Sequence, residues 1–114
     1  MEKIWLKNYP PGVPHDIQPE QYRSVSHLLE ESFKKNAQRP FSVCMDRWMS
    51  YGELDSLSSS LGAWLQSQGL EPGARVALML PNIPQFAVTM AAILRAGYTC
   101  VNVNPLYTAR ELEH

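Results

Sequence analysis

The side chains that most often carry chemistry are few and scattered in this sequence. The three histidines, His15, His27 and His114, stand far apart, and none has a histidine or cysteine neighbour at zinc-site spacing. The two cysteines, Cys44 and Cys100, fit neither a metal-ligand pattern nor the dense cysteine pattern of a small secreted domain. We interpret the histidines as surface residues and the cysteines as free thiols of a reducing compartment.

Serines and carboxylates give no clear nucleophile or acid–base pair. The serine run at residues 58–60 lies in a helical pattern, and no Gly-x-Ser-x-Gly elbow frames any serine of the chain. We therefore interpret this run as a solvated helix surface. Glu30, Glu31 and Asp55 also fall in helical segments, where we expect solvated charges and not a catalytic pair.

Phosphate binding would require a glycine-rich turn where a strand passes into a helix, so that backbone amides can approach the anion. At that position the chain has Pro-Asn-Ile-Pro, residues 81–84, whose two prolines lack amide donors. This excludes the glycine fingerprint of a Rossmann oxidoreductase. We expect no catalytic, cofactor-binding or metal-binding residue in the chain, and no cofactor bound by these residues alone.

Composition places the chain among ordinary globular proteins. Of its 114 residues 45% are apolar and 18% are charged, and the 10 basic and 11 acidic residues nearly balance. This balance leaves no basic face for a nucleic acid. The first residues do not read as a signal peptide, and the longest apolar stretch, residues 83–94, is too short and too polar to span a membrane.

The chain begins with a proline-rich arm. Residues 1–23 hold four prolines, which exclude a long helix or a central strand. The arm also holds Trp5, Leu6, Tyr9 and Tyr22, which are too apolar for a solvated tail. We expect an extended arm that lies along a folded surface of this chain or of a partner.

Residues 24–114 predict helices and strands in an α/β fold. A helix should begin at Ser24 or Ser26 and end before Pro40, and residues 41–50 should form a hairpin with Asp46 and Arg47 at its turn. A small hairpin of this kind should pack its inner face on the helices. The side chains expected on that face are Phe41 and Trp48.

The next helix starts with a capping box, because Ser50 and Glu53 can each bond the other's backbone amide. This helix should end at Gly69, because glycine readily adopts the left-handed backbone conformation that terminates a helix. The apolar residues that should line its buried stripe are Leu54, Leu57, Leu61, Trp64 and Leu65.

A parallel strand–helix–strand unit follows. Residues 75–80 predict a strand covered on both faces, and residues 98–103 predict a second one. Between them Asn82 should cap a helix that contains Pro84 in its first turn and ends at Gly97. This helix is apolar almost all round, and the chain has little left to cover both of its sides.

A second capping box, formed by Thr108 and Glu111, starts a helix at the last residues of the sequence. Isolated helices of fewer than about 12 residues are marginal. We therefore expect the chain to be a truncated piece of a larger domain.

Four stretches share motifs with a known family. Residues 4–14, residues 49–54 (Met-Ser-Tyr-Gly-Glu-Leu), residues 73–82 and, most specifically, residues 94–114 resemble the bacterial long-chain fatty-acid CoA ligases of the adenylate-forming superfamily. The departure is small, with Ala74 where the family has aspartate. Because the family pattern continues through Glu-Leu-Glu-His, we interpret residues 112–114 as native.

The resemblance implies an enzyme that uses ATP, Mg²⁺ and coenzyme A to convert a long-chain fatty acid into acyl-CoA, AMP and pyrophosphate. It implies that residues 24–114 begin the large AMP-binding domain, and that the catalytic motifs lie beyond residue 114. The chain alone would then be an inactive scaffold. We also expect a cytoplasmic enzyme, with a homodimer contact through the arm and peripheral attachment to the inner face of the cell membrane left open.

One alternative is a stand-alone α/β binding or dimerisation module that is not an enzyme. Such a module would dimerise to cover its open sheet. Continuation of the reading frame into a Ser/Thr/Gly-rich loop would distinguish the ligase from the module.

Overall fold

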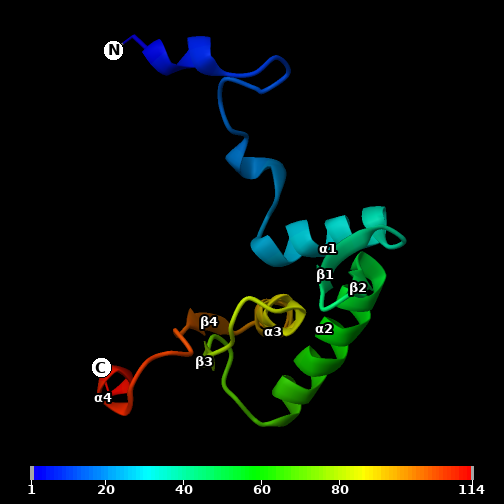
Figure 1. Ribbon diagram of the computed structural model, residues 1–114, viewed down its shortest axis with the longest axis vertical. Coiled ribbons are helices and arrows are strands. Elements are labelled where there is room, and N and C mark those ends of the chain that lie inside the picture. Colours follow the sequence, from blue (N-terminus) through cyan, green and yellow to red (C-terminus); the bar gives the residue numbers. More distant parts are fainter. Residues whose placement is uncertain (1, 114) are drawn as a thin grey trace.

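The computed structural model describes residues 2–113. It contains two short 3-10 helices, four α-helices and four strands, shown in Figure 1. In chain order they are η1 (Ile4–Asn8), η2 (Pro19–Gln21), α1 (Val25–Asn36), β1 (Pro40–Cys44), β2 (Arg47–Ser50), α2 (Tyr51–Ser67), β3 (Arg75–Leu78), α3 (Pro84–Arg95), β4 (Thr99–Asn102) and α4 (Ala109–Leu112).

The N-terminal arm stands away from the helices, as Figure 1 shows. The radius of gyration is 17.7 Å, larger than the roughly 13 Å of a compact chain of this length. We expected an extended arm, but the arm is only partly extended. The helices η1 and η2 interrupt it, and an ion pair of 2.7 Å joins Lys3 to Asp16. Its apolar side chains remain open to solvent, with Ile17 86% exposed.

Helix α1 begins where a serine can cap it. The Ser24 hydroxyl accepts a hydrogen bond from the His27 amide at 3.1 Å, so Ser24, not Ser26, starts the helix. The apolar stripe is only partly buried, because Phe33 is enclosed whereas Val25 lies in solvent.

The hairpin of β1 and β2 turns one residue earlier than predicted. Met45 and Asp46 form the turn, and both have positive φ. Val43 pairs with Trp48 across the strands, and both side chains face solvent. The prediction that Trp48 packs inward is therefore wrong, since it is 62% exposed; Phe41, at the rim, meets the Tyr51 ring edge-on at 5.2 Å between centroids.

Helix α2 confirms the predicted capping box and its stop. The Ser50 amide donates to Glu53 Oε2 at 2.8 Å, the Ser50 hydroxyl accepts from the Glu53 amide, and Gly69 has φ of 72°. Leu54 and Leu65 are buried as predicted. Two members of the predicted stripe, Leu57 and Trp64, instead face solvent.

Strands β3 and β4 form the predicted parallel pair, running in register from Arg75 opposite Thr99 to Leu78 opposite Asn102. Both strands are shorter than predicted. The N-cap residue of helix α3 is Ile83, whose side chain makes no cap hydrogen bond, and not Asn82, which lies one residue too early. Pro84 and Gly97 occupy the predicted start and stop of this helix.

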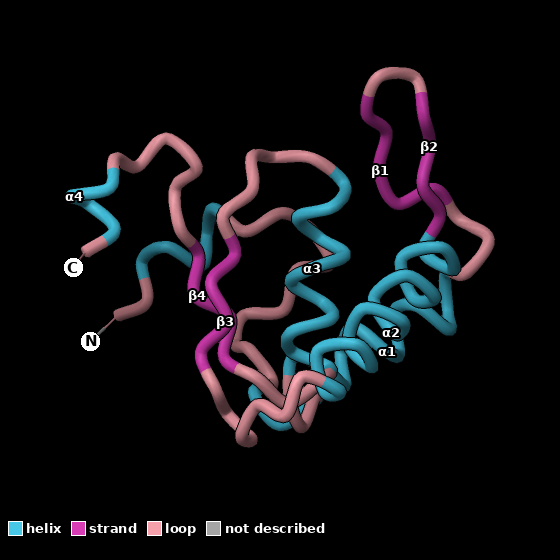
Figure 2. The backbone as a smooth tube through the Cα atoms, turned by 90° about the horizontal axis from the view of Figure 1, so that it is seen from below, coloured by secondary structure: helices cyan, strands magenta, loops and turns pink. Residues whose placement is uncertain are grey.

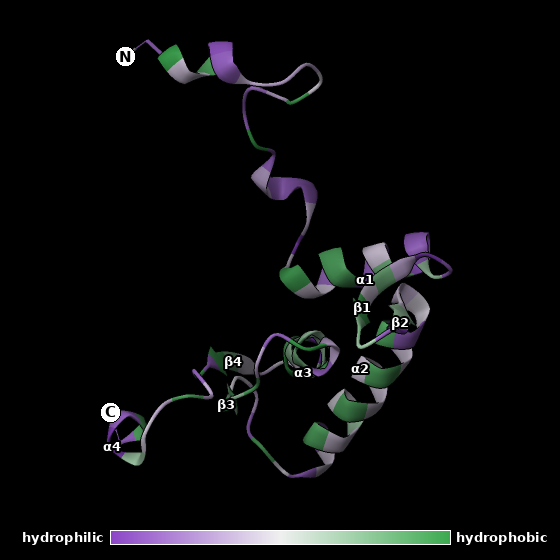
Figure 3. Ribbon diagram, in the orientation of Figure 1, coloured by the Kyte–Doolittle hydropathy of each residue, from purple (hydrophilic) through white to green (hydrophobic). Residues whose placement is uncertain are grey.

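Helix α3 lies at the centre of the fold. Figures 1 and 2 show α1 and α2 on one side of it and the β3–β4 pair on the other, and the ribbon in Figure 3 is coloured by the hydropathy of its residues. Ala92 and Ile93 join a core with Leu78 and Tyr98, while Ala91 joins a second core on the α1–α2 side.

After Gln85 every residue of α3 is at least half-buried. The expectation that the chain could not cover this helix is therefore wrong. What stays open is the outer face of the sheet, where the paired residues Ala77 and Val101 are exposed beside Met79.

Candidate functional site

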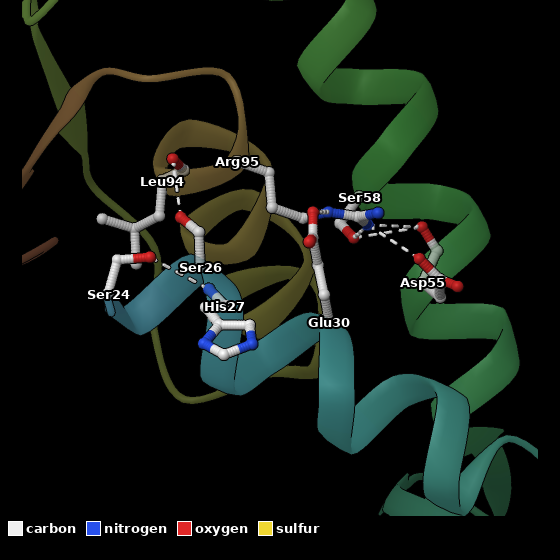
Figure 4. Close-up of polar contacts among 8 residues, drawn as sticks. All are labelled: Ser24, Ser26, His27, Glu30, Asp55, Ser58, Leu94 and Arg95. Atoms are coloured by element: carbon white, nitrogen blue, oxygen red, sulfur yellow. Dashed lines mark hydrogen bonds and ion pairs between the residues drawn. The ribbon is translucent and has the colours of Figure 1, made fainter. Parts of the chain in front are cut away.

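A cluster of polar contacts surrounds Arg95 at the C-terminal end of α3 (Figure 4). Arg95 Nη1 donates hydrogen bonds to the Asp55 carbonyl at 2.9 Å and to Ser58 Oγ at 2.8 Å, and it forms an ion pair with Asp55 Oδ1 at 2.9 Å. Arg95 Nε lies 3.7 Å from Glu30 Oε1. One guanidinium therefore joins α3 to both α1 and α2.

The charge at the centre of this cluster is shielded while its partners are not. The Arg95 side chain is only 17% exposed, whereas Asp55 and Glu30 are nearly half exposed. The guanidinium also lies 5.5 Å above the Phe33 ring, a cation–π distance. The partly solvated carboxylates of Glu30 and Asp55, together with the face of the Phe33 ring, thus offset the cost of removing the Arg95 cation from water.

This geometry supports a structural tie and not acid–base chemistry. The Ser58 hydroxyl accepts from Arg95 and donates to the Asp55 carbonyl at 3.2 Å, so no base is placed to remove its proton. Arg95 Nη1 and Nε already face protein oxygens, which leaves them poorly placed for a substrate phosphate.

The carbonyls at the end of α3 are also bound by neighbouring helices. Ser26 Oγ of α1 donates to the Leu94 carbonyl at 3.0 Å, which Figure 4 shows. Gln66 Nε2 of α2 donates to the Ala96 carbonyl at 3.3 Å. The Leu94 carbonyl also accepts from the Gly97 amide at 3.2 Å, so side chains from two other helices add to the capping of this helix end.

Helices α2 and α3 approach closely because Gly62 has no side chain. A Cβ atom at Gly62 would lie 3.3 Å from the Ala92 carbonyl oxygen, tighter than ordinary van der Waals contact. The glycine therefore sets the distance between the two helices.

The loops that leave the parallel strands are shaped by local hydrogen bonds. After β4 the Asn104 side chain accepts from the Leu106 amide at 3.0 Å, and the predicted box of Thr108 and Glu111 is confirmed. Hydrogen bonds from the Thr108 amide and hydroxyl hold the pKa of Glu111 below its usual value. After β3 the turn contains Pro81 and Pro84 and lacks a glycine.

The structure does not bring the histidines and cysteines together. His15 lies on the arm, His27 lies in the first turn of α1, and His114 is outside the described residues. Cys44 and Cys100 are free thiols, as predicted, and burial raises the pKa of Cys100. Within residues 2–113 no group of three or more His, Cys, Asp or Glu side chains could hold a metal ion.

One prediction about a polar residue is wrong. Ser58, expected on a solvated surface, is completely buried, whereas Ser59 and Ser60 of the same run are exposed; Glu30 and Asp55 are partly solvated as expected, but both are ion-paired with Arg95. A sequence signal for Ser58 exists, because it continues the spacing of Leu54, Leu61 and Leu65 along one face of α2. The partners of Arg95 had no such signal.

Over the part of the chain that the structure covers, no helix is both long and apolar enough to cross a bilayer.

Comparisons with known proteins agree with this architecture. The family described as "AMP-binding enzyme" matches residues 29–114. The long-chain-fatty-acid–CoA ligase of Escherichia coli O6:H1 is 47% identical over 115 aligned positions, which cover 100% of this chain and 20% of the relative. The enzyme of the same name from Bacillus subtilis is 34% identical, covering 99% of this chain and 20% of the relative. The chain thus spans about one fifth of the length of these relatives.

A solved structure shares the fold. The N-terminal subdomain of Klebsiella oxytoca NpsA, in complex with anthranilyl-AMSN, superposes with a TM-score of 0.78 at 26% identity, covering 87% of this chain and 26% of that one. The family match extends over most of the chain, and both the hairpin and the parallel strand pair fall within it. The chain belongs to the AMP-binding enzyme family.

Proposed function

We propose that this chain is the N-terminal scaffold of an ATP-dependent long-chain fatty-acid CoA ligase. The observation that carries the proposal is the 47% identity to the Escherichia coli ligase, which extends along the whole chain and includes the arm. A stand-alone module would have no reason to retain that arm and the full set of family motifs together.

The proposed reaction has two steps. A carboxylate oxygen of the fatty acid attacks the α-phosphorus of ATP, which releases pyrophosphate and leaves an acyl-adenylate. The thiol of coenzyme A, after losing its proton, then attacks the acyl carbonyl and displaces AMP. Mg²⁺ would offset the charge of the pyrophosphate.

The residues of this chain do not fit the binding of those groups. The described residues offer no acidic cluster for Mg²⁺, and Pro81 and Pro84 supply no amide donors for a phosphate after β3. We therefore assign no catalytic, cofactor-binding or metal-binding role to residues 1–114. ATP, Mg²⁺, coenzyme A and the fatty acid would be bound by other parts of the enzyme.

We assign residues 1–23 to the arm and residues 24–114 to the start of the AMP-binding domain. In this scheme α3 is anchored to α1 and α2 through Arg95, and it fixes the parallel strands against the helices. The loops that leave β3 and β4 are thereby held at one edge of the sheet. Support for loops is what a catalytic domain requires of such a unit.

AMP release tests the ligase proposal. The full-length enzyme, supplied with ATP, coenzyme A and palmitate, should release AMP and pyrophosphate in equal amounts, and omission of any one substrate should abolish turnover. Acetate in place of palmitate serves as the matched control. The 114-residue chain alone should release none. A full-length enzyme that gives no palmitate-dependent AMP would contradict the proposal.

We further propose that the arm contacts a second subunit of a cytoplasmic enzyme. Exposed Ile4, Trp5, Val13 and Ile17 supply apolar surface that the body of the chain does not cover, and the two free cysteines agree with a reducing compartment. Sedimentation of the full-length enzyme should give a dimer, and deletion of residues 2–22 should give a monomer. A monomeric intact enzyme that co-sediments with anionic vesicles would show that the arm serves membrane attachment instead.

A further inference from the structure

In three helices of this chain the third residue after the N-cap accepts a hydrogen bond from a backbone amide with its side chain, and one of these residues differs from the other two. In α2 and α4 the third residue after the cap is a glutamate, Glu53 or Glu111, whose carboxylate accepts a backbone amide. In α1 that position is His27. Its Nδ1 accepts a hydrogen bond from the Arg23 amide at 3.3 Å, while the Ser24 hydroxyl accepts from the His27 amide.

These contacts define the protonation state of the imidazole. Nδ1 can accept from the Arg23 amide only when it carries no proton. Nε2 lies 3.3 Å from Glu31 Oε1, where it can donate its hydrogen. The neutral ring with its proton on Nε2 therefore satisfies both neighbours.

His27 is also where the arm meets the body of the protein. The Tyr22 ring stands edge-on to the imidazole at 5.9 Å between centroids, and Tyr22 is half-buried. By contrast, residues 10–21 are all exposed. The root of the arm thus rests on the imidazole through one backbone hydrogen bond and one ring contact.

A second proton on the ring would break this junction. Nδ1–H would face the Arg23 amide hydrogen, and a positive charge would appear beside the first turn of a helix and next to the Arg23 side chain, where it is unfavourable. Glu31 would attract that charge, but it lies on α1 itself and does so equally whether the arm is attached or free. Glu30 and Arg95 are paired with each other, and Figure 4 shows the imidazole pointing away from them.

We propose that His27 is a pH-sensitive latch that holds the arm on α1 when neutral and releases it when protonated. Imidazoles gain their second proton between about pH 8 and pH 5. The Ser24 cap does not involve the ring, so α1 stays helical while the arm detaches. The latch is independent of the ligase reaction and adds a conformational control that the proposed function does not contain.

Backbone NMR relaxation of the 114-residue chain tests the latch. Heteronuclear NOE values for residues 16–23 should be high at pH 7.5 and should fall as the pH is lowered to 5.5. The released population should rise by roughly three- to tenfold, the range that one hydrogen bond contributes. Cα chemical shifts of residues 25–36 should stay helical throughout.

Variants separate the latch from a general acid effect. His27→Gln keeps an acceptor at the same position but cannot titrate, so its arm should stay attached at both pH values. Arg23→Pro deletes the amide donor, and its arm should be mobile at both. Arg23→Ala removes the same charge but keeps the amide, and should retain the pH response.

Three outcomes would overturn the latch: an arm in the unmodified chain that stays ordered at pH 5.5, a His27→Gln variant that still releases its arm, or loss of helical shifts in α1 together with the arm.

Discussion

At the scale of residues, the single side chain of Arg95 joins the C-terminal end of α3 to two other helices. It contacts Glu30, 65 positions away, and Asp55, 40 positions away. Neither pairing has a local sequence signature, because α-helical patterns report neighbours three and four residues apart. Sequence reasoning placed Arg95 at the end of α3 but could not identify what it binds.

Replacing Arg95 tests the tie directly. Arg95→Ala should lower the free energy of unfolding by about 1–3 kcal/mol, because a partly buried charged hydrogen-bond network is lost. Arg95→Lys should recover less than half of that loss, since one ammonium cannot reach Asp55, Ser58 and Glu30 together. Urea unfolding followed by circular dichroism measures the change. Equal stability of the alanine and unmodified chains would show that the cluster contributes nothing.

Two serines should respond to alanine in opposite ways. Ser42 Oγ is buried without a hydrogen-bond partner, whereas the completely buried Ser58 Oγ has two. Ser42→Ala should leave stability unchanged or raise it, because the unpaired hydroxyl is costly to desolvate, while Ser58→Ala should lower stability by about 1 kcal/mol. Chemical denaturation of both variants measures the contrast. A Ser42→Ala chain that is the less stable of the two would contradict the assignment.

The cap of α2 predicts a pH dependence. Hydrogen bonds from the Ser50 amide, and then from its hydroxyl, hold the pKa of Glu53 below the ordinary 4.5. A carboxyl whose pKa is lowered on folding stabilises the fold above its unfolded pKa, and this contribution is lost as the pH falls through the folded pKa. The stability advantage of the unmodified chain over Glu53→Gln should therefore shrink between pH 6 and pH 3.

Glu71→Gln, in the exposed turn after α2, provides the matched control for Glu53→Gln. Urea midpoints at the two pH values compare the variants. A gap between Glu53→Gln and the unmodified chain that is constant with pH would exclude the carboxylate cap.

At the scale of elements, sequence patterns located most helices and strands but misjudged which faces are buried. The two Ser/Thr–Glu boxes and the stops at Gly69 and Gly97 were predictable because local hydrogen bonds and positive φ decide them. The outward position of Trp48 was not predictable, because a two-stranded hairpin can turn either face to the helices. Tertiary packing decides that choice.

The contact between α2 and α3 gives the sharpest test at this scale. Gly62→Val should destabilise the chain by about 1–3 kcal/mol, because its side chain meets the backbone of α3 at Ala92. Ala63→Val places the same side chain on the exposed face of the same helix and should cost less than 1 kcal/mol. Thermal unfolding compares the two. A similar loss in both variants would mean that the helices are not in close contact at Gly62.

At the scale of the whole molecule, burial of α3 means that the isolated chain does not expose the apolar surface of this helix. The sequence predicted open surface on this helix, but the structure places the exposed apolar side chains elsewhere: on the arm, the hairpin, the outer face of the sheet, the outer faces of α1 and α2, and the segment after β4. The sequence could not show this, because cover for α3 comes from α2 and from α1, and α1 precedes it by about 50 residues. Burial of a helix depends on how distant elements fold back on it.

The isolated chain should therefore associate through its sheet. Unpaired strand edges and the exposed Val101 and Met79 favour pairing between copies. Sedimentation should show self-association and a hydrophobic dye should bind, and Val101→Lys should reduce both. Val43→Lys, on the exposed hairpin, is the control and should leave association unchanged. A compact monomer that ignores the dye would contradict this prediction.

Hydrogen bonds from the side chains of other helices to the end of α3 affect how this helix can unfold locally. Because Ser26 and Gln66 bind its last carbonyls and Arg95 holds both neighbouring helices, α3 cannot fray from this end without parting from α1 and α2. Its amides should thus be among the slowest in the chain to exchange for deuterium, and they should exchange at the rate at which all three helices separate.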